Sequence, residues 1–193
     1  ADFVINYPIL FLKKDGKYLS GKNYKFSDYM VGNINEIDNS LPNNDDLVLH
    51  LSTIFTENRL KQYIELRSMD TCGWGCICAG PAFFTGLLYG NLDEALEFIS
   101  KWEKKDLLNA YKDAPKKGLN TNLMGKDMIY WISNLLKIAE EGLEKRDFIG
   151  KSGSNEAKYL EHLNKIINNK ETVASHVINK FSKYQNLEDL YDK

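Results

Sequence analysis

The sequence predicts an α+β fold in which an antiparallel sheet precedes a layer of helices. Residues 1–70 are rich in β-branched and aromatic side chains and contain Asp15-Gly16, a strong two-residue hairpin signal. Residues 71–193 instead place apolar side chains at the three- and four-residue spacing of amphipathic helices. A chain of 193 residues suits one good-sized domain, so we predict a single domain with sheet mainly in 1–70 and helices mainly in 71–193.

Composition and charge argue against several classes of protein. The formal net charge is -2 and no extended basic run is present, which argues against nucleic acid as the main partner. The sequence contains no run of about 18 apolar residues, so no membrane-spanning helix is expected. The three cysteines, Cys72, Cys76 and Cys78, are odd in number and clustered. That pattern favours buried free thiols and a cytoplasmic location over a disulfide framework or a metal site.

The sheet-forming part divides into short elements. Residues 3–13 read as a strand, and Tyr18-Leu19 begins the return strand after the Asp15-Gly16 turn. A short helix is expected near residues 27–32, followed by a polar loop over 33–46. Asp45 or Asp46 would cap the next helix, because short acceptor side chains satisfy its free N–H groups.

The helical part begins with residues 81–89, which are apolar almost all round and should be buried up to a stop at Gly90. Asn91 and Glu94 have the spacing of a capping box for the following helix. A longer helix is expected over 127–145, and two shorter ones follow. The predicted core comprises Phe83, Phe84, Leu87, Leu88 and Tyr89.

Residues 62–70 read as a strand that carries the most informative pair of charges. Glu65 and Arg67 should lie on one face of it, because side chains alternate with period two. A carboxylate can hold Mg²⁺ and a guanidinium can hold phosphate, so the pair favours ATP chemistry. Arg59 could assist nucleotide binding, and a solvated salt bridge is the alternative interpretation of these charges. Ile64 and Leu66 alternate with the pair and should face a buried core.

The strand lies in a segment with the pattern HLSTIF-x-E-x-RLK-x-YIELR. This segment is followed by Gly73-Trp74 and then by the pattern C-x-x-PAF-x-x-GLLY. Together these segments resemble the plant-type and proteobacterial glutamate–cysteine ligase family. The resemblance implies a partial glutamine-synthetase-like fold, with an antiparallel sheet curved around the active site. It also implies an ATP-dependent ligase that phosphorylates the γ-carboxylate of glutamate before the cysteine amine attacks, the first step of glutathione biosynthesis. By this resemblance Glu65 would ligate Mg²⁺ and Arg67 would hold the transferred phosphoryl group.

The resemblance also carries departures and a difference in length. Thr56 and Gly73 stand where the family usually has proline, and Gly21 and Glu36 stand where plant members have the two cysteines of a redox switch. Family members have a long further stretch on the N-terminal side, so this chain is expected to be a C-terminal portion that is inactive by itself. An unpaired sheet edge would favour a homodimer or pairing with an N-terminal half.

Two further functions stay open at this point. One is a γ-glutamyl ligase that uses another amine as acceptor. The other is a non-catalytic binding or interaction module derived from half of such an enzyme.

Overall fold

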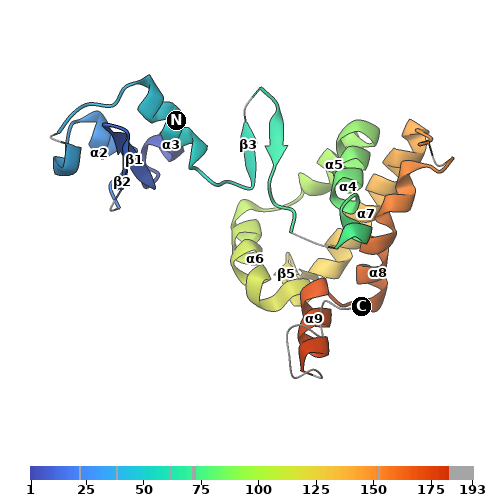
Figure 1. Ribbon diagram of the computed structural model, residues 1–193. Coiled ribbons are helices and arrows are strands. Elements are labelled where there is room, and N and C mark those ends of the chain that lie inside the picture. The colour runs from blue at the N-terminus through green and yellow to red at the C-terminus, as the bar shows by residue number, and fades with distance from the viewer. Residues whose placement is uncertain (22, 38, 61, 71–72, 152, 183–193) are drawn as a thin grey trace. The chain divides into compact units, whose positions relative to one another are not determined.

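The computed structural model describes all residues of the chain except 22, 38, 61, 71–72, 152 and 183–193 (Figure 1). It divides into two compact units, Ala1–Met69 and Asp70–Lys193. The α+β class is confirmed. Within the described ranges, however, each of the three antiparallel sheets has only two strands, so no curved glutamine-synthetase-like sheet is formed by them.

The first unit opens with helix α1 (Asp2–Ile5), strand β1 (Phe11–Lys14) and strand β2 (Lys17–Ser20). The Asp15-Gly16 hairpin is confirmed: both residues have positive φ, 49° and 75°, as a tight two-residue turn requires. The strand predicted over residues 3–13 is wrong in its first part. Residues Asp2–Ile5 form helix α1 there, and His50 Nε2 donates to the carbonyl of Val4 at 2.9 Å, a tertiary contact that the local sequence does not reveal.

The core of the first unit lies between the β1–β2 hairpin and helices α2 (Phe26–Met30) and α3 (Asn44–Ser52), with the 3₁₀ turn η1 (Asn35–Ile37). His50 on α3 is buried and stacks on Phe26 with ring centroids 4.6 Å apart. Asn43 caps α3, rather than Asp45 or Asp46, and accepts the N–H groups of both. The buried apolar residues are Ile9, Leu12, Phe26, Tyr29, Ile34 and Ile37.

Tyr29 links α2 to α3 and makes this unit sensitive to alkaline pH. Its hydroxyl donates to Asp46 at 3.1 Å, and burial, reinforced by the Asp46 charge, raises the pKa of Tyr29 to about 12. The pKa of Tyr29 in the folded state lies above the ordinary value of 10. The contribution of this phenol to the free energy of unfolding is therefore fully present below pH 10 and is lost as pH rises through 12. Between pH 9 and pH 11 the free energy of unfolding should fall by about 1 kcal/mol more in the wild type than in Tyr29→Phe. Urea titrations at the two pH values measure this, and equal losses would show that the phenol does not titrate abnormally.

The second unit is helical. The 3₁₀ turn η2 (Trp74–Cys76) precedes α4 (Ala79–Thr85), which continues into the π-helical turn η3 (Gly86–Gly90). The elements that follow are α5 (Leu92–Ile99), α6 (Lys104–Lys117), η4 (Gly118–Asn120), β5 (Asn122–Leu123), β6 (Lys126–Asp127), α7 (Met128–Arg146), η5 (Glu156–Leu160), α8 (Glu161–Asn169) and α9 (Val173–Phe181). The long helix and the two later helices are confirmed.

Helix α4 and turn η3 pack on α7 through glycine backbones. A Cβ atom built on Gly86 would lie 2.1 Å from the carbonyl oxygen of Ala139, and one on Gly142 would lie 2.1 Å from the carbonyl oxygen of Gly86. Gly90 is therefore part of the packed turn η3 and not a stop after the helix.

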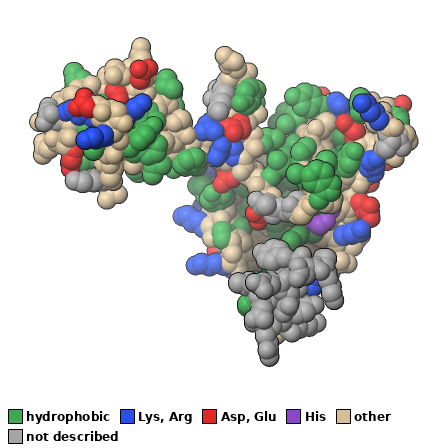
Figure 2. Space-filling model, in the orientation of Figure 1, with side chains coloured by type: hydrophobic (Ala, Val, Ile, Leu, Met, Phe, Trp, Pro, Cys, Tyr) green, Lys and Arg blue, Asp and Glu red, His purple; other side chains and the backbone are tan. Residues whose placement is uncertain are grey.

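The predicted all-round burial of residues 81–89 is wrong. Leu87 is buried, Phe83 and Phe84 are half-buried, and Leu88 and Tyr89 are 45% and 76% exposed, because the segment packs on α7 along one side. Figure 2 shows hydrophobic side chains gathered on the surface where Figure 1 places α4 and α5.

Asn91 precedes α5 as expected, but its side chain does not cap that helix. Its amide donates to the carbonyl of Ile138 at 3.2 Å, and its amide oxygen accepts a hydrogen bond from Lys145. Both partners lie on α7, so this buried side chain ties α5 to the longest described helix.

Candidate active site

The candidate site lies on a short hairpin of the first unit formed by β3 (Asn58–Leu60) and β4 (Ile64–Leu66). Arg59 lies directly opposite Glu65 in the antiparallel register, and the N–H of Arg67 extends the ladder by donating to the carbonyl of Glu57 at 2.8 Å. The strand predicted over 62–70 is thus much shorter than expected. Period-two alternation still places Glu65 and Arg67 on one face, with Arg59 beside them.

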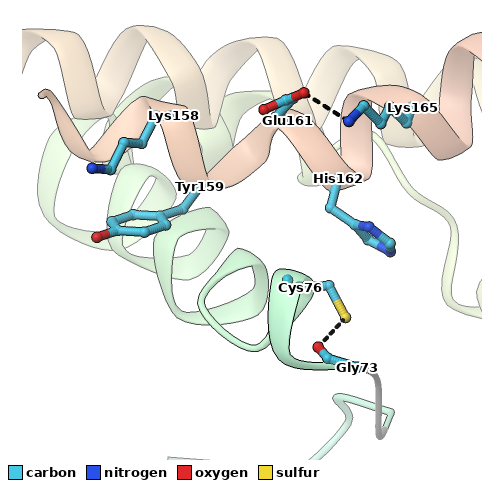
Figure 3. Close-up of a pocket in the computed structure, with 8 residues that line it drawn as sticks. Gly73, Cys76, Lys158, Tyr159, Glu161, His162 and Lys165 are labelled. Carbon is cyan, nitrogen blue, oxygen red and sulfur yellow. Dashed lines mark hydrogen bonds and ion pairs between the residues drawn. The ribbon is translucent and has the colours of Figure 1, made fainter. Parts of the chain in front are cut away.

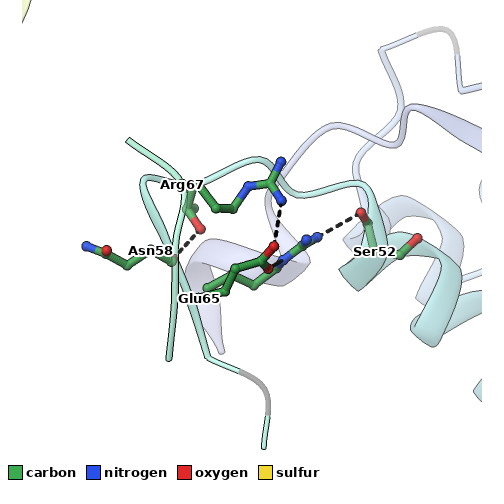
Figure 4. A network of polar contacts seen from close by, with 6 residues as sticks. Ser52, Asn58, Glu65 and Arg67 are labelled. Carbon is green, nitrogen blue, oxygen red and sulfur yellow. Dashed lines mark hydrogen bonds and ion pairs between the residues drawn. The ribbon is translucent and has the colours of Figure 1, made fainter. Parts of the chain in front are cut away.

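These three side chains form one ion-pair network, in which Figure 4 labels Glu65 and Arg67. Arg59 Nε donates to Glu65 Oε2 at 2.8 Å, and Arg67 Nη1 donates to Glu65 Oε1 at 3.1 Å. Arg59 Nη1 also donates to the carbonyl of Ser52, the last residue of α3, at 3.1 Å. The side chains are only 18% to 29% exposed, so the network is partly shielded from solvent. The hydrogen bond to Glu65 raises the pKa of Arg59, which fixes its positive charge.

The two arginines are held differently. Arg59 uses Nε and one terminal nitrogen for protein acceptors, whereas Arg67 uses one terminal nitrogen for Glu65 and places its Cζ 5.5 Å from the centroid of the Phe55 ring. A guanidinium carries five N–H donors in a planar fork. Within the described residues, Arg67 therefore keeps more N–H donors than Arg59 that could bind an anionic oxygen. The two arginines and the one glutamate of the network carry a net charge of +1.

Magnesium fits this arrangement poorly. Among the described residues, no group of three or more His, Cys, Asp or Glu side chains could hold a metal ion. Both oxygens of Glu65 already accept from guanidinium groups, and Mg²⁺ prefers oxygen ligands in near-octahedral geometry. The assignment of Glu65 as a metal ligand stays a prediction, and it requires Glu65 to release at least one arginine.

The opposite face of the hairpin differs from expectation. Ile64 is 69% exposed, so the prediction that it faces a buried core is wrong, and Leu66 is half-buried. Alternation shows which side chains share a face, but it does not show what covers the second face.

A separate cavity of about 290 Å³ lies in the second unit, against η2, η5 and α8 (Figure 3). Lys165 and Glu161 form an ion pair at 2.7 Å on its wall, and both side chains are well exposed. The Nε2 atom of His162, also on this wall, is buried without a hydrogen-bond partner. The lining residues are Gly73, Gly75, Cys76, Lys158, Tyr159, Glu161, His162 and Lys165.

The cysteines differ from the prediction of buried free thiols. Cys76 takes part in a disulfide, so its sulfur, 3.2 Å from the carbonyl oxygen of Gly73, has no proton to donate. Cys78 is free but exposed. Cys72 lies outside the described residues. Counting cysteines along a chain does not show which of them come within bonding distance.

The geometry described above defines the class of protein as an α+β protein that presents a partly shielded pair of arginines. Such a pair is suited to binding phosphate or carboxylate groups. No helix in the described parts of the chain is long and apolar enough to cross a bilayer. The model of the glutamate-cysteine ligase family 2, GCS2, matches residues 6–191. The chain therefore belongs to glutamate-cysteine ligase family 2.

Named relatives agree with this membership. The chain is similar to the chloroplastic glutamate–cysteine ligase of Solanum lycopersicum, with 36% identity over 152 residues that cover 77% of this chain and 29% of the relative. It is 30% identical to ligase A of Oryza sativa subsp. indica and 29% identical to the Arabidopsis thaliana ligase. Each of these two alignments covers 94% of this chain, and 36% and 34% of the respective relative. The chain spans about a third of the length of these curated relatives.

The names of these relatives correct one expectation. All three are called chloroplastic, so the prediction of a cytoplasmic location, which rested on cysteine usage, is wrong by this comparison. The number and spacing of three cysteines along a chain therefore do not determine its compartment.

Proposed function

We propose that this chain is part of an ATP-dependent glutamate–cysteine ligase that works through a γ-glutamyl phosphate. The observation that carries the proposal is the Arg59–Glu65–Arg67 network, on a hairpin that lies inside the region matched by the family model. Its two fixed positive charges and one shared carboxylate suit a reaction in which a phosphoryl group moves between two oxygens.

The chemistry has two steps. First, a γ-carboxylate oxygen of glutamate forms a bond to the terminal phosphorus of ATP as the bond to ADP breaks. Then the amine nitrogen of cysteine attacks the acyl carbon, the amide forms, and phosphate leaves with the carboxylate oxygen. Arg67 would hold a phosphoryl oxygen through its remaining N–H donors, while Arg59 and Glu65 fix its position. ATP is expected to bring Mg²⁺, whose role would be to neutralise phosphate charge, and Glu65 would ligate it only after releasing an arginine.

Product analysis tests this function. A complete ligase that carries this chain, or a chimera in which it replaces the matching part of the tomato relative, should form γ-glutamylcysteine and ADP from glutamate, cysteine and ATP. The 193-residue chain alone should form none, because it spans about a third of its relatives. Equal turnover with other amines in place of cysteine would favour a ligase with another acceptor, and no ATP-dependent product would contradict the proposal.

Glu65→Gln distinguishes a carboxylate that positions arginines from one that binds metal. Removing the charge weakens two charge-assisted hydrogen bonds, so kcat/KM for ATP should fall by about ten- to hundredfold. If Glu65 positions the arginines, raising Mg²⁺ should not restore the rate; if it is a metal ligand, excess Mg²⁺ should restore part of it. Glu156→Gln is the matched control, because Glu156 pairs with Arg146 in the second unit, and its rate should stay near that of the wild type.

A further inference from the structure

Phe55 is a large exposed side chain that the core does not explain. It is 61% exposed, although its neighbour Ile54 is buried. On its other side, the hydroxyl of Thr56 donates to the carbonyl of Asn58 at 2.6 Å, which ties this segment to the start of β3. The backbone of Phe55 is therefore held on both sides while its ring points away from the core.

The ring contacts the guanidinium of Arg67, with 5.5 Å between its centroid and Cζ. A cation at this distance from an aromatic ring is attracted by the ring's quadrupole. Glu65 accepts a hydrogen bond from one terminal nitrogen of the same guanidinium. The guanidinium of Arg67 is therefore held by two contacts, a hydrogen bond to the carboxylate at one edge and the cation–π contact with the ring of Phe55. Two contacts of different kinds restrict the rotation of a side chain that otherwise has many rotamers.

We propose that Phe55 is a positioning residue for Arg67, keeping the unused edge of the guanidinium directed at an anionic oxygen. The geometric part concerns the chain alone, and the catalytic part rests on the proposed function. Phe55 does not touch the reacting atoms in this account. It acts through Arg67, and its effect should vanish when Arg67 is no longer an arginine.

Nuclear magnetic resonance of the 193-residue chain tests the geometric part without any activity. The chain has three arginines, so the Arg67 Nε–H signal can be assigned by its loss in Arg67→Lys. The ring current of Phe55 should displace this signal, and Phe55→Leu should remove the displacement. Phe3→Leu is the matched control, since Phe3 is 59% exposed in the same unit and pairs with Tyr7. An Arg67 signal that is the same in wild type and Phe55→Leu would overturn the inference.

Kinetics of the complete ligase test the catalytic part. Phe55→Leu should lower kcat by about two- to fivefold, the range that corresponds to an exposed cation–π contact, and Phe55→Tyr should retain the rate. In an Arg67→Met background, which offers the ring no cation, Phe55→Leu should have no further effect on kcat. Equal losses in both backgrounds would mean a general structural role and overturn the positioning account. A displaced signal together with an inactive wild-type ligase would sustain the geometric inference and refute the proposed function.

Discussion

Arg67→Met should lower ligation by about a hundredfold or more in a complete ligase that carries this chain, because the proposed function uses the fixed charge of Arg67 to stabilise charge that develops on the phosphoryl group. The methionine keeps much of the apolar stem and loses the fork that holds Glu65 and, in the proposed function, would hold the phosphoryl oxygen. The melting temperature should stay close to that of the wild type, since Arg67 is partly exposed and belongs to a surface ion pair of small net worth. Steady-state rates and thermal unfolding of the same preparations measure both effects.

Arg146→Met is the matched control for this variant. Arg146 also pairs with a glutamate, Glu156 at 3.4 Å, and lies 6.0 Å from the ring of Tyr89. The same chemical change at this second arginine should leave turnover within about twofold of the wild type, because Arg146 lies outside the Arg59–Glu65–Arg67 network. If Arg67→Met retains a similar rate, or loses activity only because it unfolds, the Arg59–Glu65–Arg67 network is a structural salt bridge.

Gly86→Ala should destabilise the second unit by roughly 3 kcal/mol, at the upper end of what overpacking usually costs. The added Cβ would lie 2.1 Å from the carbonyl oxygen of Ala139, a backbone atom that can move only if α7 moves. Its expected signature is a lower urea midpoint in tryptophan fluorescence, because Trp74, Trp102 and Trp131 all lie in this unit.

Gly75→Ala provides the comparison for Gly86→Ala. Gly75 lies in the same unit, and a Cβ built there meets no atom within 4 Å. Its midpoint should match that of the wild type. Equal midpoints for Gly86→Ala and Gly75→Ala would show that η3 and α7 do not approach each other as closely as described.

Local chemistry explains which elements could be predicted. Asp15-Gly16 predicts a tight turn because both positions adopt positive φ, and the structure has that turn. The helix from Met128 was predictable because Asp127 caps it and apolar residues recur along it. The exposure of Leu88 and Tyr89 was not predictable, because an apolar segment does not reveal how many of its sides other elements cover.

The same division applies to the candidate site. Period-two alternation predicts that Glu65 and Arg67 share a face, and their contact at 3.1 Å agrees. Arg59 joins them only through the register of β3 on β4, which spacing along one strand does not determine. Phe55 was missed because its role depends on where the guanidinium of Arg67 turns, a property of folded side chains and not of sequence distance.

The most direct test of the account follows the oxygen of the γ-carboxylate. A complete ligase carrying this chain is given glutamate labelled with ¹⁸O in that group, together with ATP and cysteine, and the phosphate released is examined by mass spectrometry. We expect one labelled oxygen in phosphate for each γ-glutamylcysteine formed, and we expect Arg67→Met to slow label transfer as strongly as product formation. Label found in AMP, no label in phosphate, or an unchanged transfer rate in Arg67→Met would contradict it.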